Sequence, residues 1–241
     1  MAGPKVRLYV DQPLGQGQAV ALTEGAANYL FAVMRLGVGA EVLLFNGQHG
    51  EWRARVAEAN KRRGLLICDE QTRPQDFPPD LWLIFTPIKK ERTNFIVEKA
   101  VELGVARLLP VTTRRMNAER LRLDKQQAHA VEAAEQCGAT FVPRIQDLQP
   151  LDRLLADWPQ GRRLYWADEV RAGADGSWPG APGDPAAILI GPEGGFTPEE
   201  RAKLDSLDFV SPVALGPRIL RAETAALAAV TLWQTRFGDW I

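Results

Sequence analysis

The spacing of apolar residues divides the chain into two regions. From Lys5 to Glu70, short apolar or alternating runs are separated by glycine-containing turns such as NGQHG, a pattern typical of β-strands. The clearest of these runs are VRLYV, AEVLLFN and EWRARVAEA, and one amphipathic run, EGAANYLFAVMRL, predicts a short helix among them. The economical interpretation is a small, mainly β barrel of about 70 residues.

The segment TRPQDFPPD follows, and its three prolines and three charges in nine residues are typical of a linker. Beyond it, strands alternate with helices, which predicts a parallel α/β sheet covered on both faces. The predicted strands are LWLIFTP, VARLLPV, GRRLYWADE, AAILIGP and FVSPVALGP; the predicted helices are ERTNFIVEKAVELG, AERLRLDKQQAHAVEAAEQCG and about Ala222 to Phe237. We therefore predict domains over 1–72 and 77–241, with a mobile loop over 173–185.

Length and composition fit this organisation, because 241 residues suit two domains better than one. No stretch approaches the roughly 18 to 20 apolar residues that a membrane helix needs, so we expect no membrane partner. The two cysteines, Cys68 and Cys137, are too few for a disulfide framework and favour a cytoplasmic location. We expect Cys137 to be a small buried side chain.

Charge is unevenly distributed along the chain, although the net charge is only −1. Residues 1–125 hold 19 basic and 14 acidic side chains, whereas residues 126–241 hold 10 and 16. An excess of basic residues hints at an anionic partner for the first half, while solvated surface charge is the alternative for any single cluster.

One stretch, ILIGPEGGFTPEE (188–200), sets a buried strand against a glycine-rich turn. In α/β sheets, ligands bind beyond the carboxyl ends of strands, and glycines allow close backbone approach. Thr197, Pro198 and Glu200 then predict a helix start with a capping box and proline at its first position. A ligand-binding loop and a tight turn without ligand both fit this composition.

Familiar chemical motifs are missing from the sequence. It contains no GxGxxG, GxxxxGK[ST], HExxH, CxxC pair or GxSxG, and its histidines are His49 and His129. A nucleotide-dependent dehydrogenase, a hydrolytic triad and a metal site are therefore poorly supported, and we expect no metal.

A second strand ends in a Gly-Pro turn in LGPRILRAETAALAAV (215–230), close to LIGPEGGFTPEE (189–200) in the sequence. With EKAVELGV, EAAEQCG and the closing RFGDW, this pair of loops resembles the SPOUT methyltransferases, and within them the ribosomal RNA small subunit methyltransferase E family. The resemblance spans nearly the whole chain. It implies methylation of N3 of a uridine in 16S rRNA by S-adenosylmethionine.

The resemblance also implies a C-terminal domain with a deep trefoil knot, an N-terminal PUA-like barrel that helps to hold RNA, and a homodimer. The spread of apolar residues around the last helix favours a dimer surface there, formed by Leu227, Val230, Leu232, Trp233 and Phe237. The cofactor pocket would be formed by Leu189, Ile190, Gly191, Glu193, Gly194, Leu215, Gly216, Ile219 and Leu220.

Uridine N3 carries a proton that must leave before methylation. Arg221 and Glu223, at the start of the last helix, are the predicted catalytic pair: Arg221 would stabilise negative charge on the uracil oxygens, and Glu223 would accept the proton or orient Arg221. A structural salt bridge is the alternative for this pair.

RNA contacts are expected from basic residues of the first half, namely Arg7, Arg35, Lys89, Lys90, Arg92 and Arg115. Met116 and Ala139 depart from the residues usual in the family, which puts substrate contacts there in doubt. The substrate is expected to be 16S rRNA in the assembled 30S subunit, with another RNA, or a non-catalytic rRNA-binding module, as alternatives.

Overall fold

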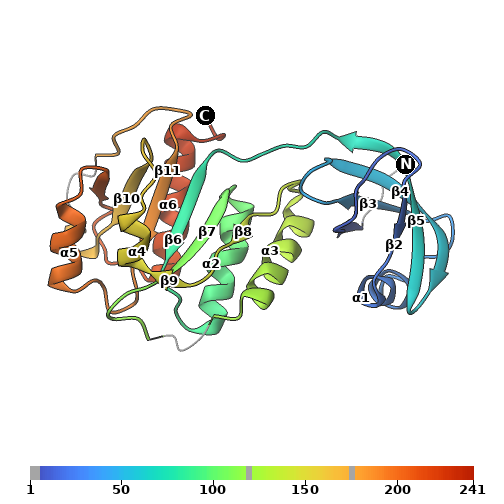
Figure 1. Cartoon of the computed structure of the whole chain (residues 1–241), viewed down its shortest axis with the longest axis horizontal. Helices are drawn as coiled ribbons and strands as arrows, with labels where there is room; N and C mark the ends of the chain where they lie inside the picture. Colours follow the sequence, from blue (N-terminus) through green and yellow to red (C-terminus); the bar gives the residue numbers. More distant parts are fainter. Residues whose placement is uncertain (1–5, 118–120, 174–176) are drawn as a thin grey trace. The chain divides into compact units, whose positions relative to one another are not determined.

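The computed structural model describes residues 6–117, 121–173 and 177–241 (Figure 1). The chain forms two compact units, one of Met1–Phe77 with Ala134–Val142 and the other of Pro78–Ala133 with Pro143–Ile241. The segment 134–142 joins the first unit although it follows the second in sequence. The domain bounds predicted from the sequence, 1–72 and 77–241, place this segment in the second domain instead.

The first unit is built on a five-stranded sheet with the order β1-β3-β4-β5-β2. Its strands are β1 (Arg7–Tyr9), β2 (Ala19–Ala21), β3 (Glu41–Phe45), β4 (Glu51–Asn60) and β5 (Arg63–Arg73). β1 and β3 are parallel and the other pairs antiparallel. The predicted helix begins as α1 (Glu24–Asn28) and continues as a π-helical turn, η1 (Tyr29–Val33).

β5 was not among the strands picked out from the sequence, although its inward residues Gly64, Leu66 and Cys68 alternate with less buried ones. These residues face the core of the first unit, with Val42, Leu44 and other apolar side chains. The period of two was present in the sequence, and the charged end of the run obscured it.

The second unit is a parallel sheet with the order β12-β10-β11-β6-β7-β8, to which β9 pairs through β7. The strands are β6 (Leu81–Phe85), β7 (Arg107–Thr112), β8 (Arg144–Ile145), β9 (Gln149–Pro150), β10 (Arg163–Ala167), β11 (Ala186–Ile190) and β12 (Val210–Val213). The helices are α2 (Lys90–Glu102), α3 (Leu123–Cys137), α4 (Leu151–Ala156), η2 (Glu169–Arg171), α5 (Pro198–Asp205) and α6 (Ala222–Phe237). The last residues of α3, from Ala134, belong to the first unit. The predicted parallel α/β sheet is confirmed.

Alternate residues of the central strands point to opposite faces of this sheet. On one face, Trp166 and Leu189 pack with leucines of α4 and with Leu204 of α5 in one apolar cluster. α6 packs against β11 and against α2, and Figure 1 shows α2 and α6 on the side of the sheet away from α4. Helices thus cover both faces, as buried parallel strands require.

The strand order contains a return that matters for the site. β11 enters the interior of the sheet between β6 and β10, two strands formed earlier in the chain, and β12 then joins the outer side of β10. This order agrees with the knotted fold that the resemblance implies, in which a later segment of the chain passes through a loop formed by an earlier one.

Several local expectations have a clear outcome. The capping box at Thr197 and Glu200, with Pro198 at the first helical position, is confirmed. α4 was missed, although Leu151, Leu154 and Leu155 have helical spacing and are all buried.

Two further expectations concern the burial of Cys137 and the loop over 173–185. Cys137 is exposed, so its predicted burial was wrong, because the last turn of α3 turns its side chain outward. Of the expected mobile loop, residues 174–176 lie outside the described residues, and 177–185 contain neither helix nor strand.

Candidate active site

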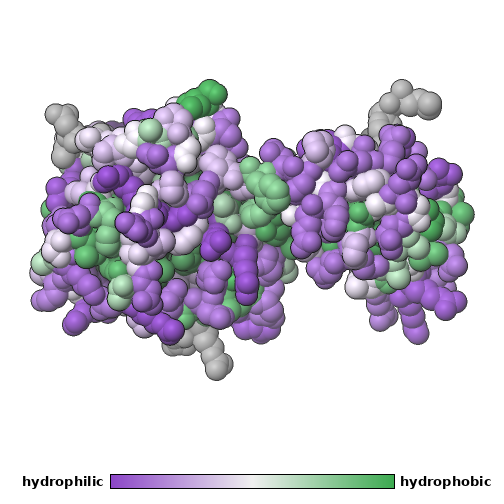
Figure 2. Space-filling view, turned by 45° about the horizontal axis from the view of Figure 1, so that its top comes forward, coloured by the Kyte–Doolittle hydropathy of each residue, from purple (hydrophilic) through white to green (hydrophobic). Residues whose placement is uncertain are grey.

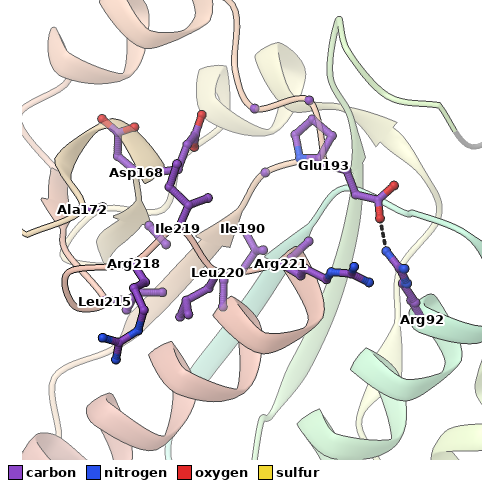
Figure 3. Close-up of a pocket in the computed structure, with 18 of the residues that line it drawn as sticks. Arg92, Asp168, Ala172, Ile190, Glu193, Leu215, Arg218, Ile219, Leu220 and Arg221 are labelled. Carbon is purple, nitrogen blue, oxygen red and sulfur yellow. Dashed lines mark hydrogen bonds and ion pairs between the residues drawn. The ribbon is translucent and has the colours of Figure 1, made fainter.

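A cavity of about 660 Å³ lies in the second unit, beyond the carboxyl ends of β10 and β11. Its walls come from the loop after β11, the loop between β12 and α6, the start of α6, and the residues that follow β10. This is the position at which open α/β sheets bind ligands. Figure 3 shows these segments meeting around the cavity.

The predicted cofactor residues converge on this cavity, with one exception. The predicted residues that line it are Ile190, Gly191, Glu193, Gly194, Leu215, Gly216, Ile219 and Leu220. Leu189 does not, because it is fully buried on the face of β11 that packs against α4 and α5. The assignment of Leu189 is therefore corrected to the core.

Glycine is required at two places in these loops. Gly195 has φ of +65°, and a Cβ there would collide with the Glu169 carboxylate. Gly216 has φ of +110°, a conformation that residues with a Cβ rarely adopt. The two loops therefore keep open, backbone-lined walls on the cavity.

An arginine joins two acidic residues at one side of the cavity. Arg92 of α2 forms an ion pair with Glu193 of the glycine loop, and its Nε lies 3.5 Å from Glu223 Oε1 of α6. Arg221, at the N-cap of α6, points in the direction of this group (Figure 3). We call Arg92, Glu193 and Glu223 the acidic cluster.

Glu223 lies beside the cavity rather than in its wall. Its side chain is 15% exposed, and its Oε2 is buried with no hydrogen-bond partner among the described residues. Arg221 lines the cavity directly. The two predicted catalytic residues are thus close to the cofactor loops and differ in their access to the cavity.

Sequence reasoning missed a second charged group in the cavity wall, which follows β10. Asp168 and Glu169 both line the cavity. Asp168 is paired with Arg201 of α5 at 2.5 Å and with Arg171 at 3.3 Å, and Arg201 also contacts Glu169 at 3.1 Å. The rule that predicted the Gly191 loop, namely a position beyond a strand's carboxyl end, applied equally to this acidic pair.

The structure separates the predicted RNA-contacting residues into engaged and available ones. Arg7 is engaged: its Nε lies 2.7 Å from Glu51, and its other nitrogens donate to the carbonyls of Ala134, Glu135 and Ala139. Its side chain is 12% exposed and stacks over Phe45. These contacts argue against an RNA contact, and Arg7 is better described as a residue that holds the first unit together.

The other basic residues are more open. Arg35, Lys89 and Lys90 are exposed, and Arg35 has an unusual φ of +57°. Arg115 is exposed but donates to the carbonyls of Gly194 at 3.0 Å and Phe196 at 3.4 Å, so it also supports the glycine loop. Lys89 and Arg92 line the cavity.

The apolar surplus of α6 is smaller than the sequence suggests. Val230 and Trp233 are buried within the protomer, and Phe237 stacks on Tyr165 with ring centroids 6.3 Å apart. Leu227 and Leu232 are half-buried. Because Val230 and Trp233 are buried, a dimer surface on α6 has fewer residues to use than predicted. On the face that Figure 2 shows, hydrophilic residues predominate, with apolar residues in patches between them.

Comparison with known proteins decides the family. Residues 75–234 match a family model described as an RNA methyltransferase domain, and residues 22–67 match one described as an RNA methyltransferase PUA domain. The first match covers well over half of the chain. The chain belongs to the ribosomal RNA small subunit methyltransferase E family.

Relatives with this family name align with most of the chain. The enzyme of Mycobacterium bovis is 30% identical, with 92% of this chain and 88% of the relative covered. That of Rickettsia conorii is 27% identical, with 93% of each covered. The crystal structure of the Neisseria gonorrhoeae enzyme bound to S-adenosyl methionine is 29% identical and superimposes with a TM-score of 0.86, covering 98% of this chain and 99% of that one.

Two further observations concern the described residues only. They include no helix that is long and apolar enough to cross a membrane. They also include no group of three or more histidine, cysteine or acidic side chains placed to hold a metal ion. His129 lies on α3 with its Nδ1 3.7 Å from Glu98.

Proposed function

We propose that the protein transfers the methyl group of S-adenosylmethionine to N3 of a uridine in 16S rRNA. The observation that carries this proposal is the cavity between two Gly-Pro loops at the carboxyl ends of the sheet, in a chain of the methyltransferase family. The sheet, the loops and the start of α6 together supply an apolar floor, free backbone groups and charged side chains.

The residues present fit the cofactor. The cavity of about 660 Å³ lies within the range of about 300 to 1,000 Å³ usual for small-molecule sites. Ile190, Leu215 and Leu220 offer apolar surface for an adenine ring, and the loop backbones offer donors and acceptors for its edge. When bound, the cofactor supplies an activated methyl group on a cationic sulfonium.

The chain's contribution is mainly alignment, because methyl transfer is an in-line displacement. The nucleophile is uridine N3, which becomes reactive when it loses its proton. We assign to Arg221 the stabilisation of negative charge on the uracil oxygens. Glu193, in the cavity wall, and Glu223, beside it, are the candidate proton acceptors, and Arg92 contacts both.

Several further features of the function are inferred from the family. We propose that the substrate is the assembled 30S subunit, since a chain of net charge −1 is poorly suited to tight binding of bare RNA. Arg35, Lys89 and Lys90 remain proposed RNA contacts, and a homodimer acting in the cytoplasm, where ribosomal subunits are found, remains part of the proposal.

The test is transfer of labelled methyl from S-adenosylmethionine to 30S subunits that lack the modification, followed by nucleoside digestion and mass spectrometry. We expect 3-methyluridine, and a faster reaction on 30S subunits than on protein-free 16S rRNA. A different methylated nucleoside would overturn the assignment of uridine N3. Equal rates on the two substrates would overturn the preference for the assembled subunit.

Two alternatives give different results in the same assay. A methyltransferase for another RNA would bind the cofactor and leave the 30S subunit unmodified. A non-catalytic RNA-binding module would transfer no methyl group to any RNA. The open cavity and the charged residues on its wall favour the enzyme.

A further inference from the structure

A second, smaller cavity adjoins the first. Its volume is about 140 Å³, roughly a fifth of the larger one, so it has room for a single ring rather than for a nucleotide cofactor. The two cavities share Lys89, Pro192 and Glu193 as lining residues. Glu193 therefore stands at the boundary between the proposed cofactor site and a separate compartment.

The remaining walls of the small cavity have the chemistry that a nucleobase needs. Pro87 and Ile88 are apolar and can cover the face of a ring. Asn117 offers both a donor and an acceptor, and Arg115 is a cation whose backbone contacts with Gly194 and Phe196 hold it in place. Enzymes that modify a base take it out of the stack into a small pocket of this kind.

We propose that this small cavity binds the target pyrimidine base and that Glu193 is the carboxylate that accepts its N3 proton. The proposal rests on the proposed function, because it concerns the substrate of the same reaction. In the step, the N3–H bond breaks and its proton passes to a carboxylate oxygen of Glu193. N3 then forms a bond to the methyl carbon as the bond from that carbon to sulfur breaks, leaving S-adenosylhomocysteine.

Accessibility distinguishes Glu193 from Glu223. Glu193 is 35% exposed and lines both cavities, whereas Glu223 lines neither. Glu223 Oε2 is closed off from solvent, so a ligand reaches it only if the surrounding side chains move. Its position in the walls of both cavities therefore makes Glu193 the better candidate for the proton acceptor.

The contacts of Glu193 suit proton transfer as well. Arg92 holds the Oε1 atom, and within the part of the chain that the structure describes no donor is hydrogen-bonded to Oε2. One oxygen is thus fixed while the other remains available to a ligand. Arg92 acts here as a positioning residue, and Figure 3 shows it and Glu193 facing one another at the side of the larger cavity.

The test compares two substitutions of equal chemistry, Glu193→Gln and Glu223→Gln, in the full-length protein. Each removes a carboxylate that Arg92 contacts and keeps the side-chain shape. Single-turnover methyl transfer to unmodified 30S subunits and the Kd for S-adenosylmethionine are measured for each. We expect Glu193→Gln to slow transfer by about 10²- to 10⁴-fold with the Kd within about 3-fold of the parent, and Glu223→Gln to slow it less than about 10-fold.

Either of two results would overturn the assignment of Glu193. One is the reverse ranking of the two variants, which would return the proton acceptor to Glu223. The other is a loss of cofactor affinity in Glu193→Gln that accounts for its loss of rate, which would make Glu193 a cofactor-binding residue. If the parent protein itself forms no 3-methyluridine, the proposed function fails, and this result is distinct from both.

The small cavity is tested separately by filling it. Asn117 is exposed, so Asn117→Trp can occupy the mouth without disturbing the core. We expect at least a 10-fold loss of methyl transfer with an unchanged Kd for S-adenosylmethionine. The control is Asp157→Trp, at an exposed residue of the same unit that lines neither cavity, for which we expect near-parental transfer. Weakened cofactor binding in Asn117→Trp would instead make the small cavity part of the cofactor site, and unchanged transfer would show that the base binds elsewhere.

Discussion

Two clusters of arginine and glutamate, one in each unit, use the same side chains in opposite proportions. In the first unit, Glu51 receives Arg7 and Arg73, each with a nitrogen 2.7 Å from Oε2, and Thr72 donates to Oε1 at 2.9 Å. In the acidic cluster of the second unit, one arginine is divided between two carboxylates. The first cluster has two cations for one anion, and the second has one cation for two anions.

The difference separates a cluster that is saturated from one that is not. Glu51 is 5% exposed and both of its oxygens are occupied, so it has nothing left to offer a ligand. Glu193 keeps one oxygen without a donor among the described residues and borders two cavities. Complete pairing indicates a role in the fold, whereas an uncompensated carboxylate beside a cavity indicates a role in chemistry.

The largest expected effect is on the saturated cluster. Glu51→Ala leaves Arg7 buried without its anion, and we expect the first unit to lose about 3 to 5 kcal/mol of stability. Hydrogen exchange measured by mass spectrometry on peptides from β1 and β4 reports this locally. Glu58→Ala, an exposed residue of the same strand, is the control, with a change within about 0.5 kcal/mol. Unchanged protection in Glu51→Ala would show that the cluster does not support the fold.

The next largest expected effect is on catalysis, at the cavity of the second unit. Arg221→Ala removes the cation that we assign to the uracil oxygens, and we expect methyl transfer to fall about 10²- to 10³-fold while the melting temperature hardly changes. Arg236→Ala, an exposed arginine near the other end of α6, is the matched control with parental activity. If Arg221→Ala unfolds the second unit or leaves transfer intact, a structural role replaces the catalytic one.

The pH dependence of stability is a smaller effect, and it follows from the saturated cluster around Glu51. Burial alone would raise the pKa of Glu51, but hydrogen bonds from Arg73, Arg7 and Thr72 outweigh it and hold the pKa below its ordinary value of 4.5. A lowered carboxyl pKa in the folded state stabilises above the unfolded pKa, and this stability is lost as pH falls through the folded pKa.

The measurement that checks this is hydrogen-exchange protection of β4 as a function of pH, with exchange rates corrected for their intrinsic pH dependence. We expect the difference between the parent and Glu51→Gln to be constant near neutral pH and to shrink below about pH 4.5. A difference that persists at the lowest pH would mean that the hydrogen bonds of Glu51, and not its charge, carry the stabilisation.

Local signals account for what could be predicted of the site. A buried strand, a Gly-Pro turn and a capping box all lie within the 13 residues of 188–200, and together they located the cavity wall. Asp168 and Glu169 also follow a buried strand, but they carry no glycine signature, and so their place in the same wall was overlooked.

Charge pairs could not be predicted, because their partners are distant in the sequence. Arg7 and Glu51 are 44 residues apart, and Arg92 and Glu193 are 101 apart. Seen only as basic residues, Arg7 and Arg92 looked equally available to RNA. Their partners make Arg7 a fold residue and place Arg92 in the acidic cluster, a distinction that depends on the tertiary structure.

The smallest expected effect on stability comes from a third group, a single ion pair that is exposed on a helix. Lys99 and Glu102 face one another on α2 at 2.6 Å, with side chains about a third exposed. A single exposed pair on a helix contributes about 0.3 to 0.5 kcal/mol. We therefore expect Glu102→Gln to lower the melting temperature by no more than about 1 to 2 °C, with the shift disappearing in 1 M salt. A larger loss would mean that exposure does not separate weak pairs from strong ones in this protein, and that the contrast between Glu51 and Glu193 must be explained by something other than burial and pairing.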